Sequence, residues 1–338
     1  MQNTVLNLSH LSVCLDTPAG TVQAVRDVSL ALYEGEVLAL VGESGCGKSM
    51  LCRAIMKLLP KSAVISGGSI TVEDVDITAY RERDMRRLRG RVFSMIFQDP
   101  LTALDPAMTV GAQIAEAVRT HGVRERGAVE RRVLELMELV GIDQPGQRWG
   151  QYPHQLSGGQ RQRCLMAMAL AGEPKILLAD EPTTALDVTV QAQILDLLRE
   201  IQQKLRTSTI LVSHDLGVVA RAADRVAIMY AGRIVEIGTA EEIYYDPRHP
   251  YTQGLLRSLP ALAKRRGALH TIPGMPPTLI DPPAGDAFAC RNPRALAIDY
   301  QQQPPMFRVS DTHYAATWLL DPRAPQLPPL TEGEEAYV

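Results

Sequence analysis

A glycine-rich run from Gly42 to Ser49 has the residue types and spacing of a phosphate-binding loop. It reads GESGCGKS and matches G-x-x-x-x-G-K-[ST], with an apolar stretch before it and a helix-forming stretch after it. The glycines allow a tight turn whose N–H groups face one anion, and the helix adds its positive end. We expect Lys48 to place its charge on the outer phosphates and Ser49 to offer its hydroxyl to Mg²⁺.

Cys46 lies inside this loop, beside the expected anion nest and the helix N-terminus. Both features lower the pKa of a thiol. One hypothesis is therefore that alkylation of Cys46 blocks nucleotide binding. The simpler interpretation, that Cys46 occupies a tolerant variable position of the loop, stays open.

Two acidic residues follow the apolar run ILLA at residues 176–179. Asp180 is expected at the end of a buried strand, where sheets of this kind keep their ligand crevice. Its carboxylate would reach Mg²⁺ directly or through water. Because side chains alternate along an extended chain, Glu181 is expected to point elsewhere, where it could polarise a water in line with the γ-phosphate.

The run LSGGQRQR, residues 156–163, opens a strongly helical stretch. Ser157, Gly158 and Gly159 are expected at the start of that helix, with free N–H groups and a hydroxyl. They would form a second anion site by the same mechanism as the first. In isolation such a string is usually only a helix cap, so its meaning depends on the other motifs.

Short apolar runs alternate with helical patterns in the first 240 residues, which predicts a mainly parallel, helix-covered sheet. The interval 109–172 carries helical periodicity without a convincing strand, and predicts a helical subdomain inserted between two strands. Fifteen of the 23 prolines lie after residue 240, so we place a domain boundary near 240–250. The predicted strands are Val37–Val41, Arg91–Phe97, Ile176–Ala179, Thr209–Val212 and Arg225–Tyr230, and the clearest helices Lys48–Leu59 and Val188–Leu205.

Composition narrows the function classes. Lys and Arg total 35 against 38 Asp and Glu, a net charge of −3, which argues against a dedicated nucleic-acid partner. The five cysteines include no CxxC pair, as expected in a reducing cytosol. We predict neither a signal peptide nor a membrane-spanning segment.

Five motifs occur in one order over residues 42–215: GESGCGKS, MIFQDP, LSGGQRQR, ILLADEPTTALD and VSHD. Together they resemble the nucleotide-binding subunits of ABC transporters, and the resemblance extends from about residue 5 to about residue 320. It implies an α/β fold: a RecA-like P-loop ATPase core with an N-terminal antiparallel β segment, an inserted α-helical subdomain and, here, a Pro-rich C-terminal extension. It also implies ATP and Mg²⁺ as ligands and ATP hydrolysis coupled to transport.

The resemblance assigns further roles. Gln98 matches the glutamine that touches Mg²⁺ and the attacking water, Asp187 the aspartate at the dimer seam, and His214 the histidine that contacts the γ-phosphate. Two chains in head-to-tail arrangement would place each LSGGQ run over the partner's ATP. The expected catalytic residues are Glu181, His214 and Gln98, and the expected Mg²⁺ ligands Ser49, Gln98 and Asp180. The expected nucleotide-binding residues are Gly42, Ser44, Gly45, Cys46, Gly47, Lys48, Ser49, Met50, Ser157, Gly158, Gly159, Gln160 and Asp187.

One departure concerns adenine. ABC subunits usually stack an aromatic side chain on the base, but Leu15 stands where that residue is expected. An aliphatic contact with adenine and a shifted alignment of this segment both remain open.

The region after residue 240 resembles the C-terminal extension of oligopeptide/dipeptide and nickel permease ATPases, in DPRHPYTQGLL and TIPGMPPTLIDPPAGDAFACRNP. That group implies an importer of dipeptides or oligopeptides, with two integral membrane permeases, an extracytoplasmic binding protein and a second, different ATPase chain. The subunit would lie peripherally on the cytoplasmic face of the inner membrane. Nickel–chelator and opine import stay open as cargo. A soluble ABC ATPase, a P-loop kinase or GTPase and an exporter fit less well.

The extension also departs from that pattern. Relatives often hold several cysteines there, and some bind an iron–sulfur cluster with them, whereas this extension has only Cys290. Asn292, Tyr300 and Thr317 stand about where other cysteines are expected. One thiolate cannot hold a four-cysteine cluster, so we predict that none is bound and that Cys290 is a buried small residue.

Overall fold

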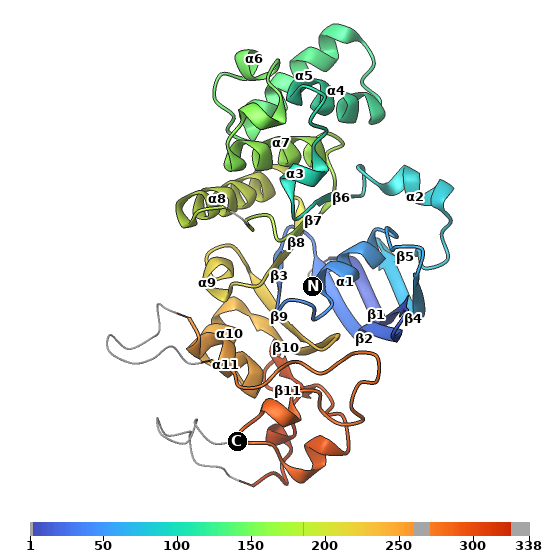
Figure 1. Ribbon diagram of the computed structural model, residues 1–338, viewed down its shortest axis with the longest axis vertical. Helices are drawn as coiled ribbons and strands as arrows, with labels where there is room; N and C mark the ends of the chain where they lie inside the picture. Colours follow the sequence, from blue (N-terminus) through green and yellow to red (C-terminus); the bar gives the residue numbers. More distant parts are fainter. Residues whose placement is uncertain (1–2, 185, 260–270, 326–338) are drawn as a thin grey trace.

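The computed structural model describes residues 3–184, 186–259 and 271–325 of the 338-residue chain. Within these residues two sheets are present, one of four and one of eight strands. The helices lie mostly around the larger sheet, as Figure 1 shows. This arrangement confirms the predicted α/β class with a separate N-terminal antiparallel segment.

The larger sheet has the strand order β11-β12-β10-β9-β3-β8-β7-β6 in the part of the chain described. Its strands β9, β3, β8, β7 and β6 are parallel, as predicted, and β10, β12 and β11 continue it with antiparallel pairing. The strands are β3 (Val37–Val41), β6 (Phe93–Ile96), β7 (Ile176–Asp180), β8 (Ser208–Ser213), β9 (Arg225–Tyr230), β10 (Arg233–Thr239), β11 (Phe307–Arg308) and β12 (Tyr314–Ala315).

The smaller sheet is antiparallel, in the order β2-β1-β4-β5. Its two long strands alternate buried and exposed side chains, which is typical of a sheet with one face on a core. The strands are β1 (Thr4–Thr17), β2 (Gly20–Tyr33), β4 (Ala63–Val72) and β5 (Val75–Asp76).

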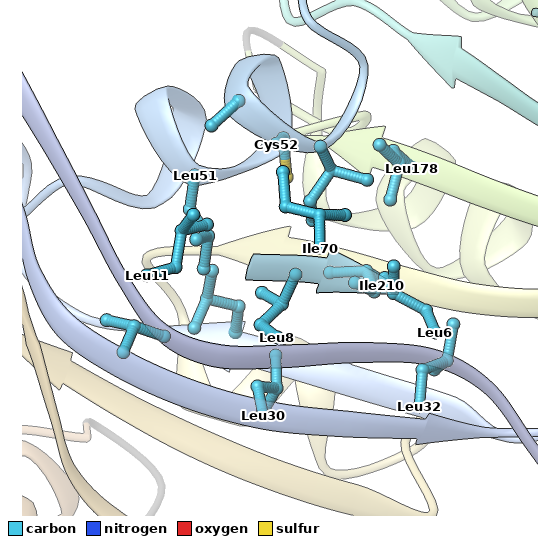
Figure 2. Packing of buried hydrophobic residues seen from close by; sticks show 14 of the residues in the cluster. Leu6, Leu8, Leu11, Leu30, Leu32, Leu51, Cys52, Ile70, Leu178 and Ile210 are labelled. Atoms are coloured by element: carbon cyan, nitrogen blue, oxygen red, sulfur yellow. The ribbon is translucent and has the colours of Figure 1, made fainter. Parts of the chain in front are cut away.

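Helix α1 (Lys48–Ile55) lies in the core between the two sheets. Figure 2 shows Leu51 and Cys52 of α1 in one apolar cluster with leucines of β1 and β2 and with Leu178 and Ile210 of the larger sheet. All of these side chains are buried, so α1 is fixed from both sides. The predicted helix to Leu59 was too long, because Lys57 has a left-handed backbone (φ 50°).

A second core lies between one face of the larger sheet and the helices that cover it. These are the helices between β6 and β7, together with α8. In Figure 1 helices α4 to α7 gather at one end of the molecule, away from α1. The helices are α2 (Glu82–Leu88), α3 (Pro100–Ala103), α4 (Val110–Thr120), α5 (Arg126–Leu139), α6 (Pro145–Arg148), α7 (Gly158–Leu170), α8 (Val188–Leu205), α9 (Leu216–Val219), α10 (Ala240–Tyr245) and α11 (Pro250–Arg257), with 3₁₀ turns at Pro153–Gln155, Ala289–Arg291, Ala297–Tyr300 and Trp318–Leu320.

The segment after residue 240 is attached to the preceding part of the chain through the larger sheet and through a third apolar cluster. Strand β12 pairs with β10, and Phe288 packs with Tyr230 of β9 and Tyr251 of α11. The extension is therefore turn-rich, as its prolines predict, yet it completes the edge of the larger sheet. The sequence pattern did not predict β11 and β12, which are two residues long.

Candidate functional site

The glycine-rich loop connects the end of β3 to the start of α1, as predicted. Gly47 is the N-cap of α1 with φ 108°, and a Cβ there would lie 2.3 Å from the carbonyl oxygen of Ala24. A Cβ at Gly42 would lie 2.1 Å from the carbonyl oxygen of Met229. Side chains are thus excluded at both positions, and the backbone of the loop is held against β2 and β9.

Lys48 is 4% exposed, and its ammonium group faces back into the loop. Nζ donates hydrogen bonds to the carbonyl oxygens of Gly42 (2.7 Å) and Glu43 (3.0 Å). A lysine held over the loop in this way can transfer its hydrogen bonds to a phosphate oxygen without a large movement.

The expectation that the loop lowers the pKa of the Cys46 thiol is wrong. Cys46 is 5% exposed, and burial raises the pKa of its thiol despite the neighbouring Lys48. Desolvation of the thiolate outweighs the nearby positive charge. The prediction that Cys290 is buried is also wrong, because the structure exposes this residue.

These positions reverse the expected order of reactivity. Under brief treatment of the native protein with iodoacetamide near neutral pH, we expect Cys290 to be labelled and Cys46 to be protected. Peptide mapping by mass spectrometry measures both sites in one sample, and urea-unfolded protein serves as the control in which both react. Preferential labelling of Cys46 in the native protein would contradict the buried placement.

Asp180 ends β7 and lies directly beside the phosphate loop. It is 2% exposed, and its Oδ1 accepts a 2.8 Å hydrogen bond from the hydroxyl of Ser49. Burial raises the pKa of Asp180, and the bond from Ser49 opposes that shift. A desolvated carboxylate beside a hydroxyl supplies two hard oxygen donors, which fits a Mg²⁺ site.

The direction of Glu181 is not set by strand alternation, so the reason that the sequence analysis gave for it was wrong. The strand ends at Asp180, and Glu181 has a left-handed backbone with φ 46°, so strand alternation does not set its direction. This conformation costs roughly 1–2 kcal/mol for a residue with a Cβ. Such strain is found at functional sites, where the surrounding structure supports it.

Three side chains converge on one carboxylate oxygen of Glu181. Oε2 accepts hydrogen bonds from Gln98 Nε2 (3.0 Å) and Thr184 Oγ1 (2.9 Å), and His214 Nδ1 lies 3.4 Å away. The predicted residues Gln98, Glu181 and His214 are thus brought together from the segments that follow β6, β7 and β8. Thr184 was missed, although it lies in the quoted run EPTTALD.

The LSGGQ run forms a capped helix start, as predicted. Ser157 is the N-cap of α7; its Oγ accepts from the Gln160 amide (3.3 Å), and Gln160 Oε1 accepts from the Ser157 amide (3.0 Å). A Cβ at Gly159 would lie 2.7 Å from Val190 of α8, so this turn lies against the start of α8. Asp187 caps α8 by accepting a 3.0 Å bond from the Val190 amide.

The residues of the LSGGQ run and those of the phosphate loop are not brought together in the single chain. The LSGGQ run belongs to the helical end of the molecule, whereas α1 and the phosphate loop lie beside the smaller sheet (Figure 1). Leu15 is half-buried on β1, opposite Val22 and Ala63. Of the remaining predicted residues, Ser44 and Gly45 are exposed in the loop and Met50 packs against the core that holds α1.

Comparison with known proteins identifies the chain. A family model described as ABC transporter matches residues 25–184, and one described as oligopeptide/dipeptide transporter, C-terminal region, matches residues 235–298. The oligopeptide transport ATP-binding protein OppD of Bacillus subtilis is 54% identical over 327 residues, covering 96% of this chain and 91% of the relative. The chain belongs to the ABC transporter ATP-binding family. Its activity is therefore ATP hydrolysis coupled to transport.

Other relatives agree with this ABC ATPase assignment. The dipeptide transport ATP-binding protein DppD of Lactococcus lactis is 51% identical, covering 97% of this chain and 94% of the relative. Among solved structures, cbiO1 of Clostridium perfringens, part of the ABC transporter complex cbiONQ, has a TM-score of 0.63 at 28% identity and covers 72% of this chain and 92% of that one. These matches confirm the predicted RecA-like ABC fold.

No helix within residues 3–184, 186–259 and 271–325 is long and apolar enough to cross a bilayer. Over the same residues, no group of three or more His, Cys, Asp or Glu side chains is arranged to hold a metal ion. Asn292 and Thr317 are buried and Tyr300 is exposed. The absence of an iron–sulfur cluster in the extension stays a prediction.

Proposed function

We propose that this ABC ATPase powers the import of dipeptides or oligopeptides across the cytoplasmic membrane. The observation that supports this proposal most strongly is the sequence identity. It exceeds 50% to oligopeptide and dipeptide transport ATP-binding proteins over nearly the whole chain. The match includes the extension, for which the family model is described by oligopeptide/dipeptide transport. We divide the chain into an ATPase domain at 1–240, with its helical subdomain near 109–172, and an extension at 241–338.

ATP is proposed to bind with its phosphates in the loop that ends at Lys48 and Ser49. The loop amides and the α1 N-terminus hold the anion, and Lys48 exchanges its bonds to loop carbonyl oxygens for bonds to the β- and γ-phosphates. The Ser49 and Asp180 oxygens, 2.8 Å apart, would hold Mg²⁺, together with Gln98. When bound, Mg²⁺ neutralises charge on the phosphate oxygens.

Glu181 is proposed to accept the proton of the attacking water. Its side chain is 12% exposed, and the hydrogen bonds from Gln98 and Thr184 fix the orientation of its carboxylate before any nucleotide arrives. His214 would contact the γ-phosphate and sense its loss. These contacts support the assignment, because a general base needs a defined direction toward the water.

The catalytic cycle is proposed to need a second ATPase chain. The separation of the LSGGQ run from the phosphate loop supports a head-to-tail pair in which Ser157, Gly158, Gly159 and Gln160 complete the partner's site, with Asp187 at the seam. The partner chain is expected to differ from this one. Two membrane permeases and an extracytoplasmic binding protein complete the importer, with this subunit peripheral on the cytoplasmic face.

Purification of the intact complex tests this proposal. We expect two integral membrane proteins and a second ATPase to copurify with the chain. Mass spectrometry of the ligand released from the associated binding protein is expected to identify short peptides. Recovery of a nickel–chelator or an opine would replace the peptide assignment, and a chain that copurifies with no membrane protein would contradict the importer.

A further inference from the structure

A partly buried ion pair joins the C-terminal extension to the phosphate loop. The guanidinium of Arg291 donates to both carboxylate oxygens of Glu43, at 2.8 Å from Nη1 and 3.0 Å from Nη2. The Arg291 side chain is 6% exposed and that of Glu43 26% exposed. Glu43 is the second residue of the loop GESGCGKS, so the two partners are 248 positions apart in sequence.

The extension and β9 hold Arg291 in a defined position. Nε donates to the carbonyl oxygen of Pro273 (2.8 Å), and Nη1 also donates to the hydroxyl of Tyr230 (3.2 Å). The guanidinium carbon lies 5.7 Å and 5.9 Å from the ring centroids of Tyr230 and Phe288. A planar fork fixed on several sides is suited to orient a carboxylate with two hydrogen bonds.

Glu43 is in turn held at its backbone. Its amide donates to the hydroxyl of Tyr251 (2.9 Å), and its carbonyl oxygen accepts from Lys48 Nζ (3.0 Å) and from the Cys46 amide (3.3 Å). The amide, carbonyl and carboxylate of one loop residue therefore each have a partner. Two of these partners, Tyr251 and Arg291, lie beyond residue 240.

Glu43 is a charged residue of the phosphate loop itself. Burial is the main cause of the raised pKa of the Cys46 thiol, and the negative charge of Glu43 adds a smaller contribution in the same direction. A carboxylate in this position would repel a triphosphate unless it is neutralised. Arg291 supplies that neutralisation, because its guanidinium keeps its charge at any physiological pH.

We propose that Arg291 is a positioning residue for the phosphate loop, through which the extension neutralises Glu43 and sets the affinity for the nucleoside triphosphate. This inference rests on the proposed placement of ATP in the loop. It gives the extension a direct role in nucleotide binding: disturbing its fold would release the carboxylate beside the phosphates.

The test compares nucleotide affinity in Arg291→Gln and in Arg291→Gln combined with Glu43→Gln. We expect Arg291→Gln to weaken binding of a fluorescent ATP analogue about tenfold, because an unpaired carboxylate remains beside the loop. The second substitution removes that carboxylate and is expected to restore most of the lost affinity. In ATPase assays of the intact complex, Arg291→Gln should raise KM and change kcat by less than about twofold, since it leaves Glu181 and Gln98 untouched.

Arg323→Gln is the matched control, because Arg323 is an exposed arginine of the same extension, paired with Asp321. It should bind nucleotide like the wild type. Unchanged affinity in Arg291→Gln, or a loss that Glu43→Gln does not restore, would overturn the inference; the latter would mean that Arg291 only supports the fold.

Two further variants keep the outcome clear. If Arg291→Gln cannot be purified folded, Arg291→Lys decides by the same comparison, with an expected loss of about threefold because the charge stays and the paired fork is lost. Lys48→Ala is measured in parallel. If Lys48→Ala binds nucleotide normally, the proposed placement of ATP has failed, whereas a loss in Lys48→Ala alone removes only the role of Arg291.

Discussion

ATP hydrolysis is expected to fall by about 10²–10⁴-fold in Glu181→Gln, the usual contribution of a general base. Glutamine has the same shape and can still accept the hydrogen bonds from Gln98 and Thr184, but it cannot take a proton from water. ATP binding should persist, and the paired ATPases should stay closed on unhydrolysed ATP. Phosphate release from the intact complex measures turnover, and ATP retained after desalting measures the trapped state.

The control for this experiment is Glu200→Gln, which removes an exposed carboxylate of α8 outside the site. It should hydrolyse ATP at the wild-type rate. Normal steady-state hydrolysis by Glu181→Gln would show that another group accepts the proton. Loss of ATP binding together with hydrolysis would instead mean that Glu181 supports the fold of the site.

The motif residues could be predicted because the strands and helices that position them are encoded by local sequence patterns. The strands Val37–Val41 and Arg225–Tyr230 and the helix Val188–Leu205 have the predicted bounds. Each is a periodic or fully apolar run bounded by polar or glycine residues, so local pattern and tertiary burial agree. The edge of the sheet at which Ser49, Asp180 and Glu181 meet then follows from the parallel order of the strands.

Features that depend on distant segments were not predictable. Cys46 is buried in the core cluster that also holds Met229 of β9, and this long-range packing is not encoded by any local pattern. The direction of Glu181 depends on a left-handed backbone that the strand pattern does not contain. The pairing of Arg291 with Glu43 joins two segments at opposite ends of the sequence. In each case the sequence shows the residue itself, but not the distant contact or the backbone conformation that determines its environment.

The second large effect is expected at Lys48. In Lys48→Ala the affinity for ATP should fall about 10- to 100-fold, the equivalent of losing charge-assisted hydrogen bonds of roughly 1.5–3 kcal/mol. Because Lys48 is buried and donates to the carbonyl oxygens of Gly42 and Glu43, its loss also removes one hydrogen-bond donor from each of these two acceptors. Titration of a fluorescent ATP analogue measures the affinity, and thermal unfolding without nucleotide separates binding from stability.

Lys204→Ala supplies the matched control, since Lys204 is an exposed lysine in the last turn of α8. It removes the same charge from the chain and should bind ATP normally. Lys48→Arg is expected to bind weakly as well, because a space that leaves Lys48 4% exposed cannot take a wider guanidinium without displacing the loop. Wild-type affinity in Lys48→Ala would contradict the phosphate loop as the ATP site. A lower unfolding temperature with unchanged affinity for ATP would mean that Lys48 only stabilises the fold of the loop.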